Sequence, residues 1–194
     1  MHLCESAEDA LTTIRRIDPR RAVICYPAIR QWVDNKYAAK AEPYESQFQF
    51  DNEKLGLEIC AWRDEEFPKH ISQRPRTLVL VGPTRLGKTQ WARSLGPHNY
   101  FNSNFNFKKW NPDAKYCIID DFGWEYFAST HHHHAALKAL TWGQEEVEVT
   151  DKYMPKETIK GMPCIFICNQ LPGIFETENW SQNVMIVNVT EHLY

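Results

Sequence analysis

A glycine-rich run followed by a lysine and a threonine is the part of this 194-residue sequence best suited to chemistry. Its spacing fits the phosphate-loop pattern G-x-x-x-x-G-K-[ST]. The eight positions are Gly82, Pro83, Thr84, Arg85, Leu86, Gly87, Lys88 and Thr89. Glycines let backbone N–H groups close around phosphate oxygens, while Lys88 can reach the β- and γ-phosphates and the Thr89 hydroxyl can bind Mg²⁺. The motif therefore predicts binding of a nucleoside triphosphate, with ATP and Mg²⁺ as the expected ligands.

Two adjacent acids, Asp120 and Asp121, end an apolar run that begins at Lys115. A carboxylate there can offset the charge of Mg²⁺, so we expect Asp120 to hold the metal. Asp121 would then polarise the attacking water. A second apolar run brings Asn169 to its C-terminal end. Because ligands of parallel sheets lie at that edge, Asn169 is a candidate sensor of the γ-phosphate.

A parallel sheet with helices is needed to position these side chains. Residues 77–81, before the phosphate loop, predict a buried strand, and residues 90–95 predict a helix that ends at Gly96 and Pro97. Further strands are predicted over 115–121, 163–169 and 184–189. The fold class that follows is α/β.

The first part of the chain has a different character. Residues 6–41 show helical periodicity that is broken at Asp18–Pro19, and Ser6 with Asp9 resembles a capping box. A second helix is expected from Pro27 to Tyr37. Two short helices bury little surface alone, so they must pack on the main domain or on a neighbouring subunit, and both alternatives stay open.

Between the helices and the phosphate loop, residues 42–56 are polar and irregular and predict a linker. A short apolar helix is expected over 55–62, and a loop is expected over 99–112. We therefore predict a helical segment with its linker over 1–56 and an α/β ATPase domain over 57–194.

Residues 144–161 alternate in the manner of a β-hairpin. Its tip and return arm carry Lys152, Tyr153, Lys156 and Lys160, and a basic hairpin can grip the phosphates of single-stranded DNA. Nearby glutamates dilute this charge, so charge alone favours a solvated hairpin. The four successive histidines His131–His134 could bind metal, but successive side chains cannot all point one way, and we expect no functional metal site there. Residues 135–140 predict a short helix.

Composition sets wider bounds. The sequence is 43% hydrophobic with a formal charge of −3, which is typical of a soluble globular protein and gives no overall nucleic-acid signature. No apolar run approaches the roughly 20 residues needed to span a bilayer, so no membrane is expected. Six scattered cysteines predict reduced core thiols of an intracellular protein. Cys164 and Cys168 share one face of a predicted strand, where packing is favoured over zinc binding.

Taken together, these motifs resemble the superfamily 3 helicase domain of geminivirus replication initiator proteins (Rep). The resemblance is carried by GPTRLGKTQWARSLGPHNY, by YCIIDD as the Walker B motif, and by DKYMPKETIKGMPCIFICN as the B-prime and C motifs. It covers about residues 75–190. The stretch from Ser6 to Tyr44 has an R-x-x-D-P pattern and looks like the helical oligomerisation region of that family.

The resemblance implies an AAA+-type P-loop sheet in which the Asn169 strand lies between the phosphate-loop and Walker B strands. It implies a homo-oligomer, expected as a hexameric ring, on single-stranded and forked viral DNA in the host cell nucleus. ATP would drive 3′-to-5′ unwinding during rolling-circle replication, with Lys152 and Lys160 on a hairpin that lines the channel. Other host or viral replication proteins would be further partners.

Two departures from the family pattern matter. The nicking domain, with its His-hydrophobe-His motif and tyrosine nucleophile, is missing from these residues, so we expect a fragment that does not cleave DNA. No arginine follows Arg93, so no arginine finger can be placed. The same lack argues against a nucleotide kinase, which uses lid arginines on phosphates. An ATP-binding assembly module without unwinding activity remains an alternative.

Overall fold

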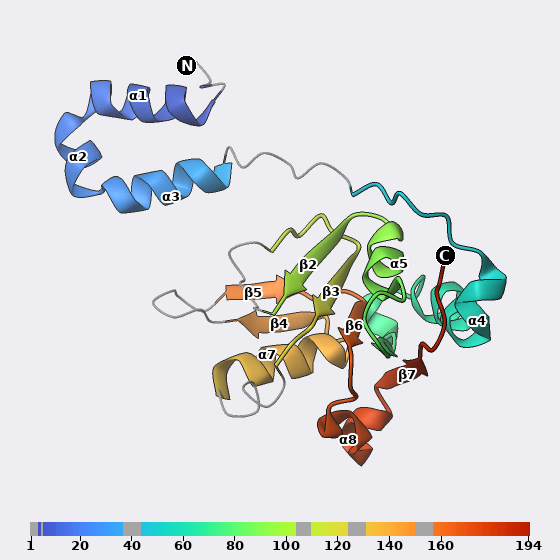
Figure 1. The fold of residues 1–194 in the computed structure, drawn as a ribbon. Coiled ribbons are helices and arrows are strands. Elements are labelled where there is room, and N and C mark those ends of the chain that lie inside the picture. The colour runs from blue at the N-terminus through green and yellow to red at the C-terminus, as the bar shows by residue number, and fades with distance from the viewer. Residues whose placement is uncertain (1–3, 5, 37–43, 104–109, 124–130, 150–156) are drawn as a thin grey trace. The chain divides into compact units, whose positions relative to one another are not determined.

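A computed structural model describes residues 4, 6–36, 44–103, 110–123, 131–149 and 157–194 (Figure 1). The chain forms two compact units, Met1–Glu42 and Pro43–Tyr194. The prediction grouped residues up to 56 with the helical segment. In the structure, residues 44–56 have contacts in the second unit, where Phe48 stacks on Tyr194.

The described part of the first unit is helical. It contains α1 (Ala7–Ile17), α2 (Pro19–Ile24) and α3 (Tyr26–Lys36). Ser6 caps α1 by accepting a hydrogen bond from the Asp9 N–H at 3.2 Å, as the capping pattern predicted. Asp18 caps α2, and Pro19 occupies its first position, where its missing N–H costs nothing. The predicted break is therefore confirmed, but the separate helix α2 was missed.

Five of the described strands form a parallel sheet in the order β2-β3-β6-β1-β7. They are β1 (Thr77–Val81), β2 (His98–Asn102), β3 (Tyr116–Asp120), β6 (Cys164–Cys168) and β7 (Val184–Asn188). Strand β6 lies between β1 and β3, so the strands that lead to the phosphate loop, to Asn169 and to the two acids are neighbours. This confirms the predicted AAA+-type P-loop fold class.

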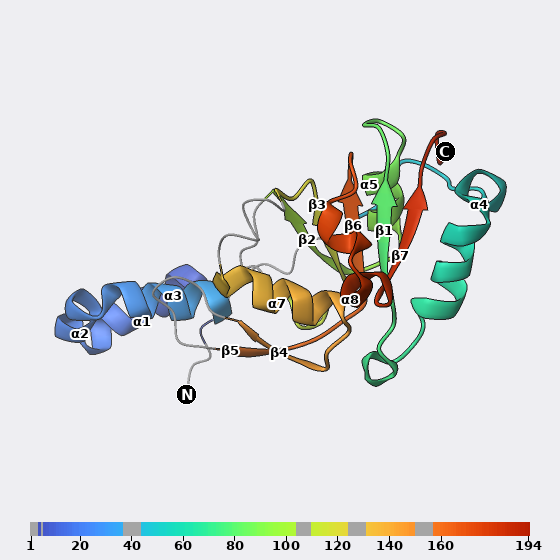
Figure 2. The same cartoon turned by 90° about the horizontal axis from the view of Figure 1, so that it is seen from below.

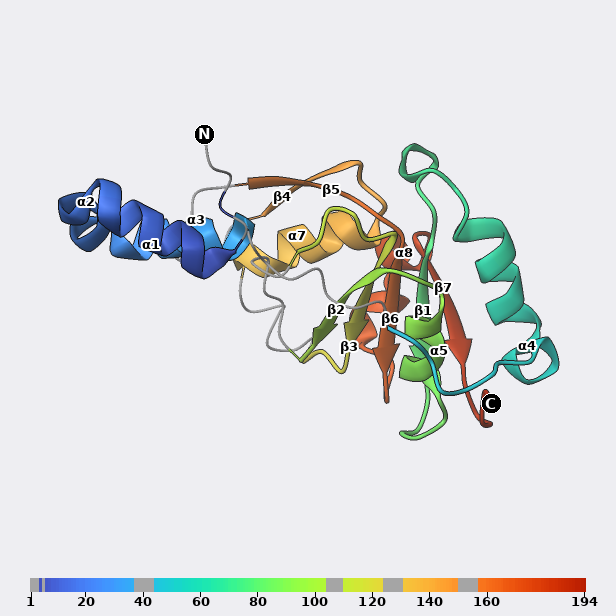
Figure 3. The same cartoon turned by 90° about the horizontal axis from the view of Figure 1, so that it is seen from above.

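Both faces of the sheet are covered, which explains its continuous apolar strands. Leu80 and its neighbours on one face pack against α4 (Asn52–Ala61) and α5 (Lys88–Ser94). Val79 and its neighbours on the other face pack against α7 (His131–Thr141). Figures 2 and 3 show α7 on one side of the sheet and α4 and α5 on the other. In the part of the chain that the structure describes, no helix could cross a membrane.

A second, two-stranded sheet is the predicted hairpin of β4 (Glu146–Val149) and β5 (Glu157–Lys160). Val147 and Val149 are buried in the same core as α7. Short helical turns complete the unit: the π-helix η1 (Trp62–Glu66), the 3₁₀ turns η2 (Ile71–Gln73) and η4 (Gly173–Glu176), and α8 (Glu178–Ser181).

Strand β2 is the main departure from the prediction, which made residues 99–112 a loop. Asparagine is depleted in strands, so the local sequence argues against one here. Tertiary contacts decide the outcome, because β2 pairs with β3 along its length. The side chain of Asn99 also accepts from the N–H of Asn111 at 2.7 Å and donates to its carbonyl at 3.0 Å.

Three helices begin earlier than predicted. Helix α4 begins at Asn52 because the Asp51 side chain accepts the N–H of Glu53. Helix α5 begins at Lys88 inside the phosphate motif, and the backbone of α7 begins at His131. The histidine side chains themselves lie outside the described residues, so their metal-binding capacity stays untested.

The cysteines of the sheet behave as the sequence predicted. Cys117, Cys164 and Cys168 are buried free thiols on the sheet face that α7 covers. Burial raises the pKa of Cys168 to about 11. Among the described residues, no group of three or more His, Cys, Asp and Glu side chains is placed to hold a metal ion. Core packing is the role that these thiols fill.

Candidate nucleotide-binding site

The phosphate loop joins β1 to α5, and two of its positions accept only glycine. Gly82 has a φ of 152°, and a Cβ there would lie 2.1 Å from the Val189 carbonyl oxygen. Gly87 caps α5 with a φ of 89°, and its Cβ would lie 2.6 Å from the Tyr194 ring. A side chain at either position would force the loop apart. The tight turn that lets N–H groups face a phosphate therefore depends on both glycines.

Lys88 is the first residue of α5 and is only 5% exposed. Its amine donates hydrogen bonds to the carbonyl oxygens of Gly82 and Pro83, each at 2.7 Å. Burial lowers the pKa of Lys88, and the negative charges of Asp120 and Asp121 partly oppose that shift. The amine is thus held beneath the loop in a position to meet phosphate oxygens.

Asp120 ends β3 and is buried, and two hydroxyl groups donate to the same carboxylate oxygen. The Thr89 Oγ1 and the Tyr100 hydroxyl each lie 2.9 Å from Asp120 Oδ2. Burial and the hydrogen bond to Asp120 raise the pKa of Tyr100 to about 12, so the phenol stays a donor. Mg²⁺ prefers oxygen ligands such as carboxylates and hydroxyl groups. The Thr89 and Asp120 oxygens therefore fit this metal in their chemistry.

Asp121 and Asn169 follow the neighbouring strands β3 and β6 and are both exposed. Asp121 adopts a φ of 50°, and its N–H donates to the Ile167 carbonyl at 3.1 Å. This turn lets two successive acids line one cavity, whereas an extended strand would send them to opposite faces. The Asp121 carboxylate and the Asn169 amide therefore lie at the carboxyl edge of the sheet. The sequence predicted them at this edge, as the groups that would activate water and sense the γ-phosphate.

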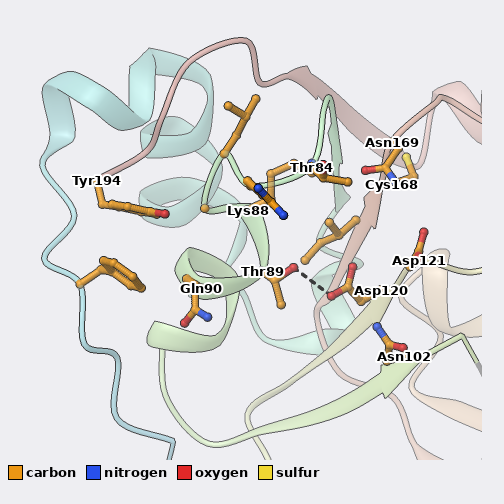
Figure 4. Close-up of a pocket in the computed structure, with 15 residues that line it drawn as sticks. Thr84, Lys88, Thr89, Gln90, Asn102, Asp120, Asp121, Cys168, Asn169 and Tyr194 are labelled. Carbon is orange, nitrogen blue, oxygen red and sulfur yellow. Dashed lines mark hydrogen bonds between the residues drawn. The ribbon is translucent and has the colours of Figure 1, made fainter.

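A cavity of about 500 Å³ brings these groups together (Figure 4). Of the predicted site residues, it is lined by Thr84, Arg85, Leu86, Gly87, Lys88, Thr89, Asp120, Asp121 and Asn169. Gly82 and Pro83 do not line it, but their carbonyl oxygens accept the hydrogen bonds of Lys88. The described groups thus form one polar pocket at the carboxyl edge of the sheet.

Several lining residues were not anticipated from the sequence: Phe48, Gln90, Asn102, Cys168 and Tyr194. Tyr100 was also missed, although it holds Asp120. In β2, Asn99 and Phe101 are buried while His98 and Tyr100 are half-buried. This alternation is a property of the folded strand, because the asparagines of this stretch give no apolar–polar alternation in the sequence. No local pattern marks Phe48, since it enters the site only through its contact with Tyr194.

Among the predicted DNA-binding residues, the structure describes Lys160, which does not line this pocket. Lys152, Tyr153 and Lys156 lie outside the described residues. Lys160 is exposed on β5, directly opposite Glu146 on β4. This opposite-charge pairing means that the described face of the hairpin carries little net positive charge.

Comparison with known proteins supports a viral relationship. Residues 1–91 match the geminivirus Rep protein central domain. The replication-associated protein of Cabbage leaf curl virus (isolate Jamaica) is 33% identical over 173 residues, which cover 86% of this chain and 48% of that protein. The replication-associated protein of Tobacco yellow dwarf virus (strain Australia) is 33% identical over 162 residues, which cover 79% of this chain and 44% of that protein.

A solved structure of JCV helicase bound to an acetamide compound also aligns, covering 91% of this chain and 61% of that one. Its sequence identity is 13% and its TM-score is 0.35, too low to support the fold, which rests instead on the strand order.

The chain spans about half the length of the curated relatives that it matches. The central-domain match covers its first part, and the replication-associated proteins align with most of its length. The chain therefore belongs to the geminivirus Rep family.

Proposed function

We propose that this chain is an ATP-hydrolysing DNA helicase motor of a viral replication initiator protein. The observation that carries the proposal is the single cavity lined by Lys88, Thr89, Asp120, Asp121 and Asn169. These are the parts that phosphoryl transfer to water requires: a phosphate cradle, metal ligands, a base and a γ-phosphate contact. The membership in the Rep family supports the same role.

Each residue has a distinct task in this proposal. The N–H groups at the start of α5 and the Lys88 ammonium stabilise the negative charge of the phosphates. Thr89 and Asp120 hold Mg²⁺, which supplies further charge neutralisation when it is bound. Asp121 orients the attacking water and accepts its proton. Asn169 donates its amide N–H to the γ-phosphate.

Assembly and DNA contact extend the proposal. The chains would form a ring, expected as a hexamer, around single-stranded DNA. The DNA would contact the hairpin that carries Lys152, Tyr153, Lys156 and Lys160. ATP hydrolysis would move the ring along the DNA in the 3′-to-5′ direction. The expected setting is rolling-circle replication in the host cell nucleus, together with other replication proteins. Exposed apolar side chains on the first unit, such as Val23 and Ile24, are available for contacts between subunits.

A second candidate is an ATP-binding assembly module that oligomerises without unwinding. The observation that favours it is the lack of any arginine after Arg93 in the sequence, because an arginine acting across a subunit boundary is worth about 10³–10⁵ in hydrolysis rate. A strand-displacement assay with and without ATP separates the two candidates. Release of the displaced strand only with ATP supports the helicase.

The proposed site is tested with Lys88→Ala. We expect ATP hydrolysis to fall by at least about 10²-fold, because one cationic contact to the transition state is lost. Lys115→Ala is the matched control, since this lysine is exposed beside β3 and does not line the cavity. Both variants should keep the circular dichroism spectrum of the parent. Undiminished turnover in Lys88→Ala would refute the assignment.

A further inference from the structure

The cavity has a second end that the proposed hydrolysis does not use. Phe48, Gln90 and Tyr194 line it beside the start of α5. In Figure 4, Tyr194 lies on the opposite side of Lys88 from Asp120 and Asp121. A polar, carboxylate-lined end and an aromatic end therefore flank the phosphate loop.

Two segments far apart in sequence make the aromatic end. The rings of Phe48 and Tyr194 stack with centroids 4.0 Å apart and planes inclined by 27°. We call them the aromatic pair. Both side chains are half-buried, so part of the pair faces the cavity instead of the protein core.

Local contacts fix both rings in place. The Ser46 hydroxyl accepts the N–H of Phe48 and donates to its carbonyl, each at 3.1 Å. The N–H of Leu193, whose side chain is buried, donates to the Leu86 carbonyl in the phosphate loop at 3.0 Å. This bond sets the Tyr194 ring directly against Gly87. The pair is preorganised before any ligand arrives, which lowers the entropic cost of binding.

A nucleotide is polar at its triphosphate and aromatic at its base. If its γ-phosphate points to Asp121 and Asn169, its base extends past Lys88 to the other end of the cavity. Aromatic side chains stack on bases with about 1–3 kcal/mol per base. We propose that the aromatic pair is the surface on which the nucleobase of the bound triphosphate stacks. This inference rests on the proposed function of the same site.

The test compares ATP with inorganic tripolyphosphate, which has the phosphates but no base. Dissociation constants are measured by calorimetry with Mg²⁺ for the parent chain, Phe48→Leu and Tyr194→Leu. We expect each variant to bind ATP about tenfold more weakly, the effect of losing one stacking contact, and to bind tripolyphosphate as the parent does. Tyr194→Phe keeps the ring and should keep ATP affinity within about twofold.

Phe50→Leu is the matched control. The Phe50 ring packs edge-on against Tyr194 at 6.3 Å but does not line the cavity, so ATP affinity should not change. Unchanged ATP affinity in Phe48→Leu and Tyr194→Leu would overturn the inference. Equal losses for ATP and tripolyphosphate would do so too, because the rings would then only support the loop.

Lys88→Ala separates this outcome from failure of the proposed function. If Lys88→Ala loses affinity for both ATP and tripolyphosphate, the phosphates bind at the phosphate loop. That conclusion holds whether or not Phe48→Leu and Tyr194→Leu change the affinity for ATP. Parent-like binding of both ligands in Lys88→Ala would refute the phosphate site itself.

Discussion

At the scale of single residues, the side chain of Tyr100 contacts two charged groups in addition to its backbone pairing in β2. Its hydroxyl shares Asp120 Oδ2 with Thr89, and the guanidinium of Arg93 lies 4.6 Å from its ring centroid. A carboxylate held by two donors has little freedom to rotate. Tyr100 is therefore a positioning residue for the metal ligand in the proposed mechanism.

We expect Tyr100→Phe to lower ATP hydrolysis about tenfold, because a hydrogen bond to a charged group is worth about 1.5–3 kcal/mol. The Mg²⁺ concentration for half-maximal activity should rise, while ATP affinity without metal stays unchanged. The measurement is hydrolysis across a Mg²⁺ titration. Lys115→Ala is the control, since this lysine is exposed and does not line the cavity. An unchanged Mg²⁺ dependence in Tyr100→Phe would contradict the positioning role.

Among the elements, the π-helix η1 is tied to the start of β1 by a buried acid. Glu66 accepts hydrogen bonds from Lys69 Nζ at 2.8 Å, from the Arg76 N–H at 3.1 Å and from Arg76 Nε at 2.9 Å. Trp62 Nε1 donates to the Arg76 carbonyl at 2.7 Å. Burial alone would raise the pKa of Glu66, but these hydrogen bonds outweigh it and hold the pKa below its usual value.

We expect Glu66→Gln to lower the unfolding free energy by about 1–3 kcal/mol at pH 7. Because the folded pKa of Glu66 is depressed, its stabilisation is present above the unfolded pKa and is lost as pH falls through the folded pKa. The variant should therefore lose less stability on acidification than the parent does. Urea unfolding at pH 7 and pH 4 measures both effects.

Asp64→Asn is the control for that comparison, since its exposed carboxylate pairs with the adjacent Arg63 at 2.7 Å and exposed ion pairs contribute little to stability. Equal pH dependence in the parent and in Glu66→Gln would contradict the role of the buried acid.

The hairpin β4–β5 is the element on which the DNA proposal depends. Its described outer face pairs Glu146 with Lys160 and Glu148 with Thr158. A basic surface would therefore have to come from the tip, outside the described residues.

We expect Lys152→Ala combined with Lys160→Ala to weaken stimulation of ATP hydrolysis by single-stranded DNA. The slope of log affinity against log salt should fall by about 1.4, since each phosphate contact on a single strand contributes about 0.7. Lys54→Ala combined with Lys115→Ala is the control, because both lysines are exposed on other elements. If single-stranded DNA stimulates ATP hydrolysis equally in the hairpin variant and in the parent, the hairpin does not bind DNA and is only a solvated surface element.

For the whole molecule, the proposed function requires assembly. We expect ATP and a short single-stranded oligonucleotide to convert the 22.8 kDa chain into a particle of about six times that mass, as proposed for the ring. Light scattering coupled to size exclusion measures this mass. A monomer under every condition would contradict the proposed ring.

The family resemblance implied that the Asn169 strand lies between the phosphate-loop strand and the strand of the two acids. The sequence alone determined the phosphate loop, the two acids and the strands β1, β3, β6 and β7. These features depend on local chemistry: glycines at strained turns, apolar runs long enough for buried strands, and polar residues at strand ends. The hairpin was also predictable, because alternation of Val147 and Val149 with glutamates is a local signal.

Only the tertiary structure decided the role of Tyr100, the strand β2 and the aromatic pair. No residue near Tyr100 in the sequence predicts its contact with Asp120. The asparagines of β2 favour a loop by their local propensity. Phe48 and Tyr194 meet only because the chain returns past the phosphate loop after β7. Long-range pairing contributes more free energy at these positions than local propensity does, so a one-dimensional pattern cannot reveal them.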